Sequence, residues 1–163
     1  MKISRGICAC AFGPYARDPV AFDKIAERLS EAGYDGIEVC GFPPHVTLSS
    51  HQTAESRRAL VQFLRDLNLE VSGDAADFTL ANPLTEGNSE KYLELFKRNL
   101  ELVKALDSPT IRVDSVAAPG MMAGPELESA MGRLSAIWNK ASVLAEDSGV
   151  RVVWEFEPGF VFN

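Results

Sequence analysis

The sequence predicts an α/β fold with a parallel sheet, organised as the first five strands and four helices of a (β/α)8 barrel that is incomplete as given. Short apolar strands alternate with amphipathic helices, and successive strands begin roughly 30 to 40 residues apart, the length of one strand–helix unit. Apolar and polar residues alternate within the strands, whereas strands buried on both faces of an open sheet read as continuous apolar runs. No linker interrupts the pattern, so we expect residues 1–163 to form a single domain.

The first two strand–helix units are predicted from apolar spacing and from residues that begin or end helices. The first strand is expected over 3–12. Asp18, followed by a proline, is expected to cap the first helix, and Gly33 to end it. The second strand is expected over 36–40, and Thr53 is expected to cap the second helix.

The remaining units repeat this arrangement. The later strands are expected over 69–72, 110–114 and 150–157. Ser89 is predicted to open the third helix, and the fourth is predicted to begin at about Pro125 and to be ended by Gly149. Its apolar face is expected to comprise Leu127, Met131, Leu134, Ile137, Ala141 and Leu144. Asp74 and Asp77 are expected to cap turns after the third strand.

Strand periodicity gathers ionisable residues on one face of the sheet. A period of two places apolar residues against the helices and polar residues on the opposite face. In a barrel that opposite face is the interior, and its C-terminal end is the active site. The residues expected there are Glu38, Arg112, Asp114 and Glu155. A purely structural alternative is that these charges form a buried layer of ion pairs, for instance between Arg112 and Glu38.

Composition narrows the classes of function. The net charge of −7 argues against a general nucleic-acid binder, because an acidic surface repels phosphate backbones. No apolar run approaches the roughly 20 residues that cross a bilayer, so we expect no membrane association. The three cysteines, Cys8, Cys10 and Cys40, suggest small buried residues of a reduced, cytoplasmic protein, with a thiolate metal site as the alternative.

Nucleotide-binding and hydrolase motifs are missing from the sequence. There is no Gly-x-Gly-x-x-Gly after the first strand, no Gly-x-x-x-x-Gly-Lys-Ser/Thr and no Gly-x-Ser-x-Gly. An open Rossmann-like sheet is therefore the weaker alternative to the barrel.

Three segments resemble a known family. They are Gly33-Tyr-Asp-Gly-Ile-Glu38, Pro109-Thr-Ile-Arg-Val-Asp114 and Gly149-Val-Arg-Val-Val-Trp-Glu155, in this order and at the strand ends. In these features the chain resembles the xylose isomerase-like TIM barrels, a group of sugar isomerases and epimerases that also includes endonuclease IV-type enzymes.

The resemblance implies a divalent metal at the barrel mouth. In such enzymes the glutamate that ends strand five binds the metal, and Glu155 occupies this position here. Many relatives follow this glutamate with one apolar or polar residue and then histidine, whereas this chain has Phe156, Glu157 and Pro158. Oxygen ligands suit Mg²⁺ or Mn²⁺, and added histidine would admit Zn²⁺ or Co²⁺, so the metal is not determined.

The function that these residues predict is a metal-dependent isomerisation or epimerisation of a sugar, polyol or sugar phosphate. Proton transfer next to a carbonyl gives an enediolate, which a metal can stabilise while a carboxylate acts as acid or base. Glu155 is the predicted catalytic residue and metal ligand. The predicted substrate-binding residues are Glu38, His45, Arg112, Asp114 and Glu157. DNA repair of the endonuclease IV type is disfavoured by the acidic balance.

The predicted barrel lacks its last strands, since a closed barrel needs eight strands and roughly 250 residues. Strands one and five would present open edges, and the inner face would be left to water. We therefore expect a second copy of the chain, or a chain that supplies the missing strands, to cover them. By itself the chain is expected to be inactive, which leaves a non-catalytic, partner-dependent half barrel as the alternative function.

Overall fold

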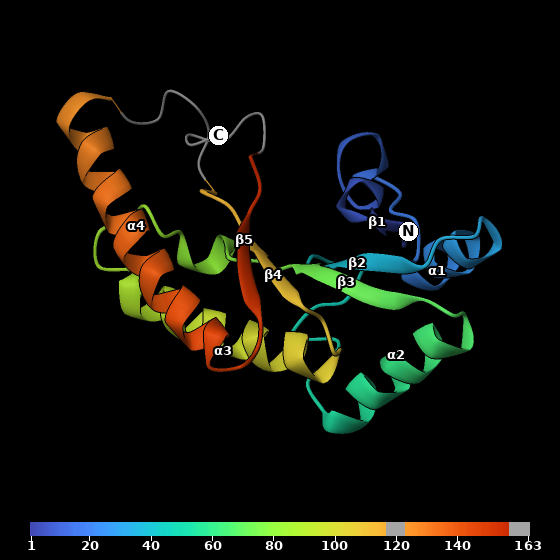
Figure 1. Ribbon diagram of the computed structural model, residues 1–163. Helices are drawn as coiled ribbons and strands as arrows, with labels where there is room; N and C mark the ends of the chain where they lie inside the picture. Colours follow the sequence, from blue (N-terminus) through green and yellow to red (C-terminus); the bar gives the residue numbers. More distant parts are fainter. Residues whose placement is uncertain (117–122, 157–163) are drawn as a thin grey trace.

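The computed structural model describes residues 1–116 and 123–156 and shows a five-stranded parallel sheet in the order β1-β2-β3-β4-β5. The strands are β1 (Ser4–Gly6), β2 (Gly36–Cys40), β3 (Glu70–Ala75), β4 (Thr110–Val113) and β5 (Arg151–Trp154). Each strand pairs in parallel with the next one along the chain. This sequential order is that of a barrel, and Figure 1 shows the sheet with β1 and β5 at its two ends.

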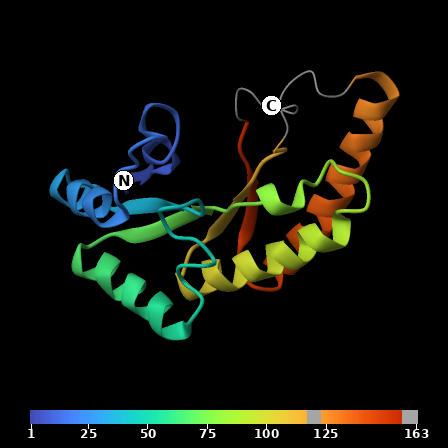
Figure 2. The ribbon, with the colours of Figure 1, turned by 180° about the vertical axis from the view of Figure 1, so that it is seen from behind.

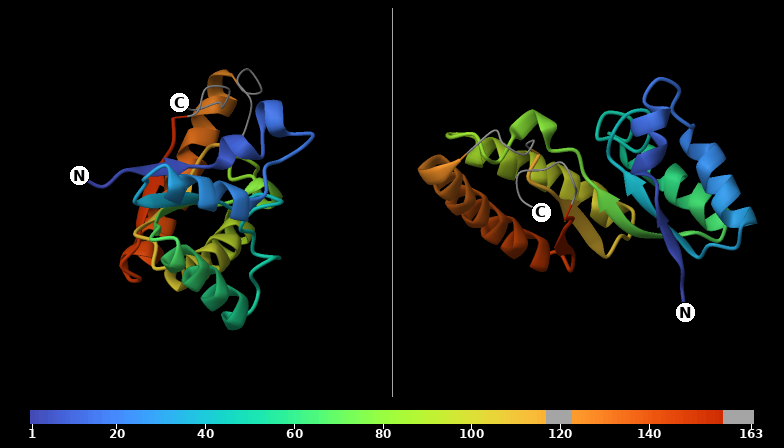
Figure 3. Two further views of the ribbon diagram at one scale, coloured as in Figure 1. Left: turned by 90° about the vertical axis from the view of Figure 1, so that its right-hand side faces the viewer. Right: turned by 90° about the horizontal axis from the view of Figure 1, so that it is seen from above.

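Helices connect successive strands and cover one side of the sheet. They are α1 (Phe22–Glu31), α2 (Ala54–Asp66), α3 (Ser89–Ala105) and α4 (Gly124–Glu146). Figures 1 and 2 show α2 and α3 on one side of the sheet and the segment that follows β1 on the other. Figure 3 shows α3 and α4 side by side at the end of the sheet away from α1. The predicted fold class, part of a (β/α)8 barrel, is confirmed.

Three of the residues predicted to start or stop helices do so in the structure. The Thr53 side chain accepts a hydrogen bond from the Ser56 backbone nitrogen at 3.1 Å and caps α2. Gly33 and Gly149 follow α1 and α4 with φ of 79° and 71°, a left-handed conformation that favours glycine. No helix in the part of the chain that the structure describes is both long and apolar enough to span a membrane.

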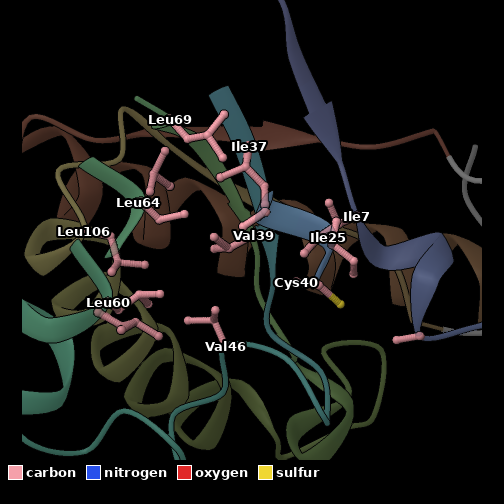
Figure 4. Packing of buried hydrophobic residues seen from close by; sticks show 14 residues of the cluster. Ile7, Ile25, Ile37, Val39, Cys40, Val46, Leu60, Leu64, Leu69 and Leu106 are labelled. Atoms are coloured by element: carbon pink, nitrogen blue, oxygen red, sulfur yellow. The ribbon is translucent and has the colours of Figure 1, made fainter. Parts of the chain in front are cut away.

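The hydrophobic core lies between the sheet and its helices. Ile37 and Val39 of β2 are fully buried and lie with Leu64 of α2 in one cluster, as Figure 4 shows. A second cluster joins Ile111 of β4 to Phe96 of α3 and to residues of α4. The apolar residues that alternate along the strands therefore face the helices, as the period of two requires.

Several predictions about the elements are wrong in detail. β3 continues to Ala75 instead of ending at residue 72, and β5 ends at Trp154 instead of residue 157. β1 ends at Gly6 instead of residue 12, because the chain turns into a 3-10 helix over Cys8–Cys10. α1 begins at Phe22 instead of after Asp18; the Val20 backbone N–H bonds the Cys10 carbonyl at 3.1 Å, which holds this segment out of the helix. Met131, predicted on the inner face of α4, is 51% exposed.

Candidate functional site

Three charged side chains meet on the sheet face opposite the helices. Arg112 of β4 forms ion pairs through Nη1 with Oε2 of Glu155 at 2.8 Å and with Oε2 of Glu38 at 3.4 Å. Glu38 lies on β2, and Glu155 directly follows β5. The predicted gathering of these residues on one face is thus confirmed, and an arginine stands between the two carboxylates.

The electrostatics of Glu38 differ from those of a surface carboxylate. Its side chain is 22% exposed, and that of Arg112 is 16% exposed. Burial raises the pKa of Glu38, the positive charge of Arg112 opposes this increase, and the negative charge of Glu155 raises the pKa further. A raised pKa makes the carboxylate a stronger proton acceptor than a surface glutamate.

These side chains line a cavity of about 670 Å³ together with Asp114. The Asp114 carboxylate accepts a hydrogen bond from the Val116 backbone nitrogen at 2.9 Å, which orients the side chain at the end of β4. Cys8 and Phe42 add apolar surface to the same cavity. A hollow that combines apolar walls with a few convergent charged groups is typical of a small-molecule site.

Two glycines leave room for the Glu38 carboxylate. A Cβ atom at Gly6 of β1 would lie 2.7 Å from Glu38 Oε2, and one at Gly73 of β3 would lie 2.8 Å from Thr110 Oγ1 and 3.4 Å from Glu38 Cγ. Both distances to the nearest atom are too short for any real side chain. Sequence reasoning missed these residues, although glycine inside a strand is a known sign that another group approaches closely.

Asp74 is a second carboxyl group that sequence reasoning placed wrongly. It lies within β3 instead of capping a turn, and it is fully buried. Its register partners are Val39 and Ile111, which face the helices. Neither carboxyl oxygen has a hydrogen-bond partner among the described residues. Burial raises the pKa of Asp74 to about 8, with smaller increases from Cys40 and Glu38 and an opposing effect of Arg112.

A register shift within β3 determines which side of the sheet Asp74 faces. Ile37 pairs with Val71 but Glu38 pairs with Gly73, so Ser72 is an extra residue. From this point each side chain of β3 faces the side opposite to the one that strict alternation gives. Asp77, by contrast, does cap a turn, since its Oδ1 accepts a hydrogen bond from the Thr79 backbone nitrogen at 2.9 Å.

One other predicted substrate contact, His45, lies away from the cavity. His45 is 2% exposed, and its Nε2 donates a hydrogen bond to the Val20 carbonyl at 2.9 Å, so the histidine joins the loop after β2 to the segment before α1. It is not among the residues that line the cavity in the described part of the chain. Substrate contact at His45 stays a prediction, and Glu157 lies outside the described residues.

Comparison with protein families decides the classification. The model of the xylose isomerase-like TIM barrel family matches residues 26–163. The chain belongs to this family. A comparison with curated protein sequences found no match.

Solved structures of related fold extend well beyond this chain. A structure described as IolI protein with a binding zinc atom is 18% identical, has a TM-score of 0.75, and is matched over 100% of this chain and 55% of its own. A D-tagatose 3-epimerase-like protein gives 17% identity and a TM-score of 0.70 over 98% of this chain and 54% of its own. The probable 3-DHS dehydratase AsbF of Bacillus anthracis gives 20% identity and a TM-score of 0.64, over 98% and 54%. The chain thus spans about half the length of these structures.

The family membership raises the question whether the described residues can hold a metal. They contain no group of three or more His, Cys, Asp or Glu side chains arranged around a possible ion. Glu155, the residue that resembles the family's metal ligand, is instead paired with Arg112. The described part of the chain therefore offers one candidate ligand and does not form a metal site by itself.

Proposed function

We propose that this chain supplies the N-terminal half of the active site of a sugar isomerase or epimerase, whose substrate is a sugar, a polyol or a sugar phosphate. The observation that carries the proposal is the ion-paired set of Glu38, Arg112 and Glu155 at the wall of the cavity. The neighbouring structures named as epimerases support the class of reaction.

The proposed reaction moves a proton at the carbon next to the substrate carbonyl. Glu38 is suited to take up and return this proton, because burial raises the pKa of its carboxyl. The Arg112 guanidinium lies within the same group of side chains, where a positive charge stabilises the negative oxygen of the enediolate. Asp114 would hold substrate hydroxyl groups at the cavity wall.

We further propose that Glu155 binds a divalent metal once the barrel is closed. In that case the remaining ligands come from outside the described residues, and Arg112 has to release the carboxylate. Glu155→Gln should then weaken metal binding with little loss of stability, as measured by calorimetry on the closed barrel. Glu101→Gln on the exposed surface of α3 is the matched control. Equal affinity in the Glu155→Gln variant and the parent would contradict this role.

The experiment that tests the reaction is hydrogen exchange with solvent. A protein that contains this chain within a closed barrel is incubated in heavy water with a panel of aldoses, ketoses and their phosphates. We expect deuterium to enter the carbon next to the carbonyl, and Glu38→Gln to reduce the rate at least about 100-fold, the usual contribution of a general base. No exchange with any member of the panel, or unchanged exchange in Glu38→Gln, would overturn the proposal.

The two end strands of the sheet suggest that another chain covers its edges and its inner face. β1 and β5 are the end strands, and the side chain of Phe156, just past β5, is 65% exposed. We propose that a second copy, or a chain that supplies further strands, covers this surface. Sedimentation of the 163-residue chain should show self-association or a loosely packed species without turnover. A compact, active monomer with a cooperative melt would contradict the proposal.

A further inference from the structure

A groove lies between α3 and α4, on the side of the sheet opposite the candidate site. It has a volume of about 660 Å³, and Figure 3 shows the two helices side by side. The strands follow one another in chain order, so in a closed barrel the helices form a ring in the same order, and α3 lies between α2 and α4. Further strands and helices therefore do not fill this groove.

Three apolar side chains line the groove. Leu93 of α3 and Leu144 of α4 are partly buried against the core cluster that contains Ile111. Val143, the neighbour of Leu144 in α4, is 59% exposed. Because removal of apolar surface from water is favourable, a partner that covers Val143 gains stability from this contact.

Charged side chains line the groove on both helices. Glu90, Glu94 and Lys97 share one face of α3, because they are spaced i, i+4 and i+7, and Glu94 forms an ion pair with Lys97. On α4, Lys140 lies one turn before Leu144. Neither Glu90 nor Lys140 has an ion-pair partner among the described residues. Each helix thus contributes one charge that is not paired within the described chain, and the two charges are opposite.

We propose that this groove is an interaction surface for a second copy of the chain. In a dimer whose twofold axis runs along the groove, α3 of one copy lies opposite α4 of the other. Glu90 then faces the partner's Lys140, and the symmetric contact forms as well. Val143 is covered by the partner's Leu93. The charges select this occupant, since a partner of a single sign of charge would leave either Glu90 or Lys140 opposite a like charge.

This dimer does not depend on the proposed isomerase function. The groove is separate from the two end strands, β1 and β5, and from the cavity that Glu38, Arg112 and Glu155 line. Contacts through the sheet edges are the same in every variant of α3 and α4, so differences between such variants report on the groove.

The test mixes two charge-reversed variants of the 163-residue chain, Lys140→Glu and Glu90→Lys. Alone, each variant places like charges opposite each other in both symmetric contacts, so its self-association should weaken at least about tenfold. In the mixture both contacts again join opposite charges, and association should recover to the level of the parent. Sedimentation velocity of chains that carry two different fluorophores measures self-association and mixed association.

A second pair of variants tests the apolar part of the groove. Val143→Asn should weaken association, whereas Met131→Asn, at a position of α4 that is 51% exposed and outside the groove, should leave it unchanged. All four positions are exposed, and circular dichroism checks that each variant folds. A monomeric parent, equal association of all variants, or a mixture that associates no better than its components would overturn the proposal.

Discussion

The two faces of the sheet give a buried carboxyl group different surroundings. On the inner face, Glu38 has Arg112 as an ion-pair partner and a cavity beside it. On the helix-facing side, Asp74 is enclosed with no hydrogen-bond partner among the described residues. Burial raises the pKa of both groups, but Glu38 has a cation within ion-pair distance, whereas Asp74 has none in the part of the chain that the structure describes. The inner face thus carries charged side chains, and the helix-facing side carries apolar side chains, with Asp74 as the exception.

The largest expected difference between the two faces is in how much their side chains contribute to the free energy of unfolding. Ile111→Ala removes a fully buried side chain that contacts α3 and α4, so the free energy of unfolding should fall by about 2–5 kcal/mol. Val153→Ala on β5, which removes a partly exposed side chain, should cost less than about 1 kcal/mol. Urea denaturation measures both. Equal losses would mean that the helix-facing side is not the core.

Asp74 should make stability depend on pH. Because its pKa is raised from 3.8 to about 8, the folded protein keeps a proton that the unfolded chain releases between these values. The free energy of unfolding should therefore fall as pH rises from 3.8 toward 8, by about 1–4 kcal/mol. Asp74→Asn should flatten this slope, and the control Asp77→Asn should leave it. A slope that persists in Asp74→Asn would contradict the assignment.

Much of the fold could be predicted because strand and helix periodicity depends on local sequence. The caps at Thr53, Gly33 and Gly149 and the order of the strands follow from it. The start of α1 could not be predicted, because contacts with Cys10 and His45, distant in sequence, hold Val20 outside the helix.

Part of the site could also be predicted from the periodicity of the strands. Strict alternation places Glu38, Arg112 and Glu155 together, and the ion pairs follow. Asp74 was misplaced because the predicted strand ends at residue 72, whereas β3 continues past an extra residue to Ala75; Gly73 is a known mark of such a bulge. The burial of His45 depends on a loop contact that no local pattern encodes.

Substitution of two glycines by alanine should have smaller and opposite effects on the stability of the fold. Gly6→Ala brings a Cβ to within 2.7 Å of Glu38 Oε2 and should displace the carboxylate, at a cost of about 1–3 kcal/mol. Gly132→Ala in α4 meets no atom within 4 Å and should instead stabilise the helix by about 0.5–1 kcal/mol. Thermal melts compare the two. Stabilisation by Gly6→Ala would show that the space beside Glu38 is not constrained.

The most direct test of the account is a titration of the Glu38 carboxyl carbon by NMR. Glu38, Arg112 and Glu155 act on one another on the inner face. We therefore expect the pKa of Glu38 to lie above the ordinary 4.5 in the parent. It should rise further in Arg112→Gln because the cation is lost, and fall in Glu155→Gln because a negative charge is lost. A Glu38 that titrates at 4.5 and responds to neither substitution would contradict this expectation.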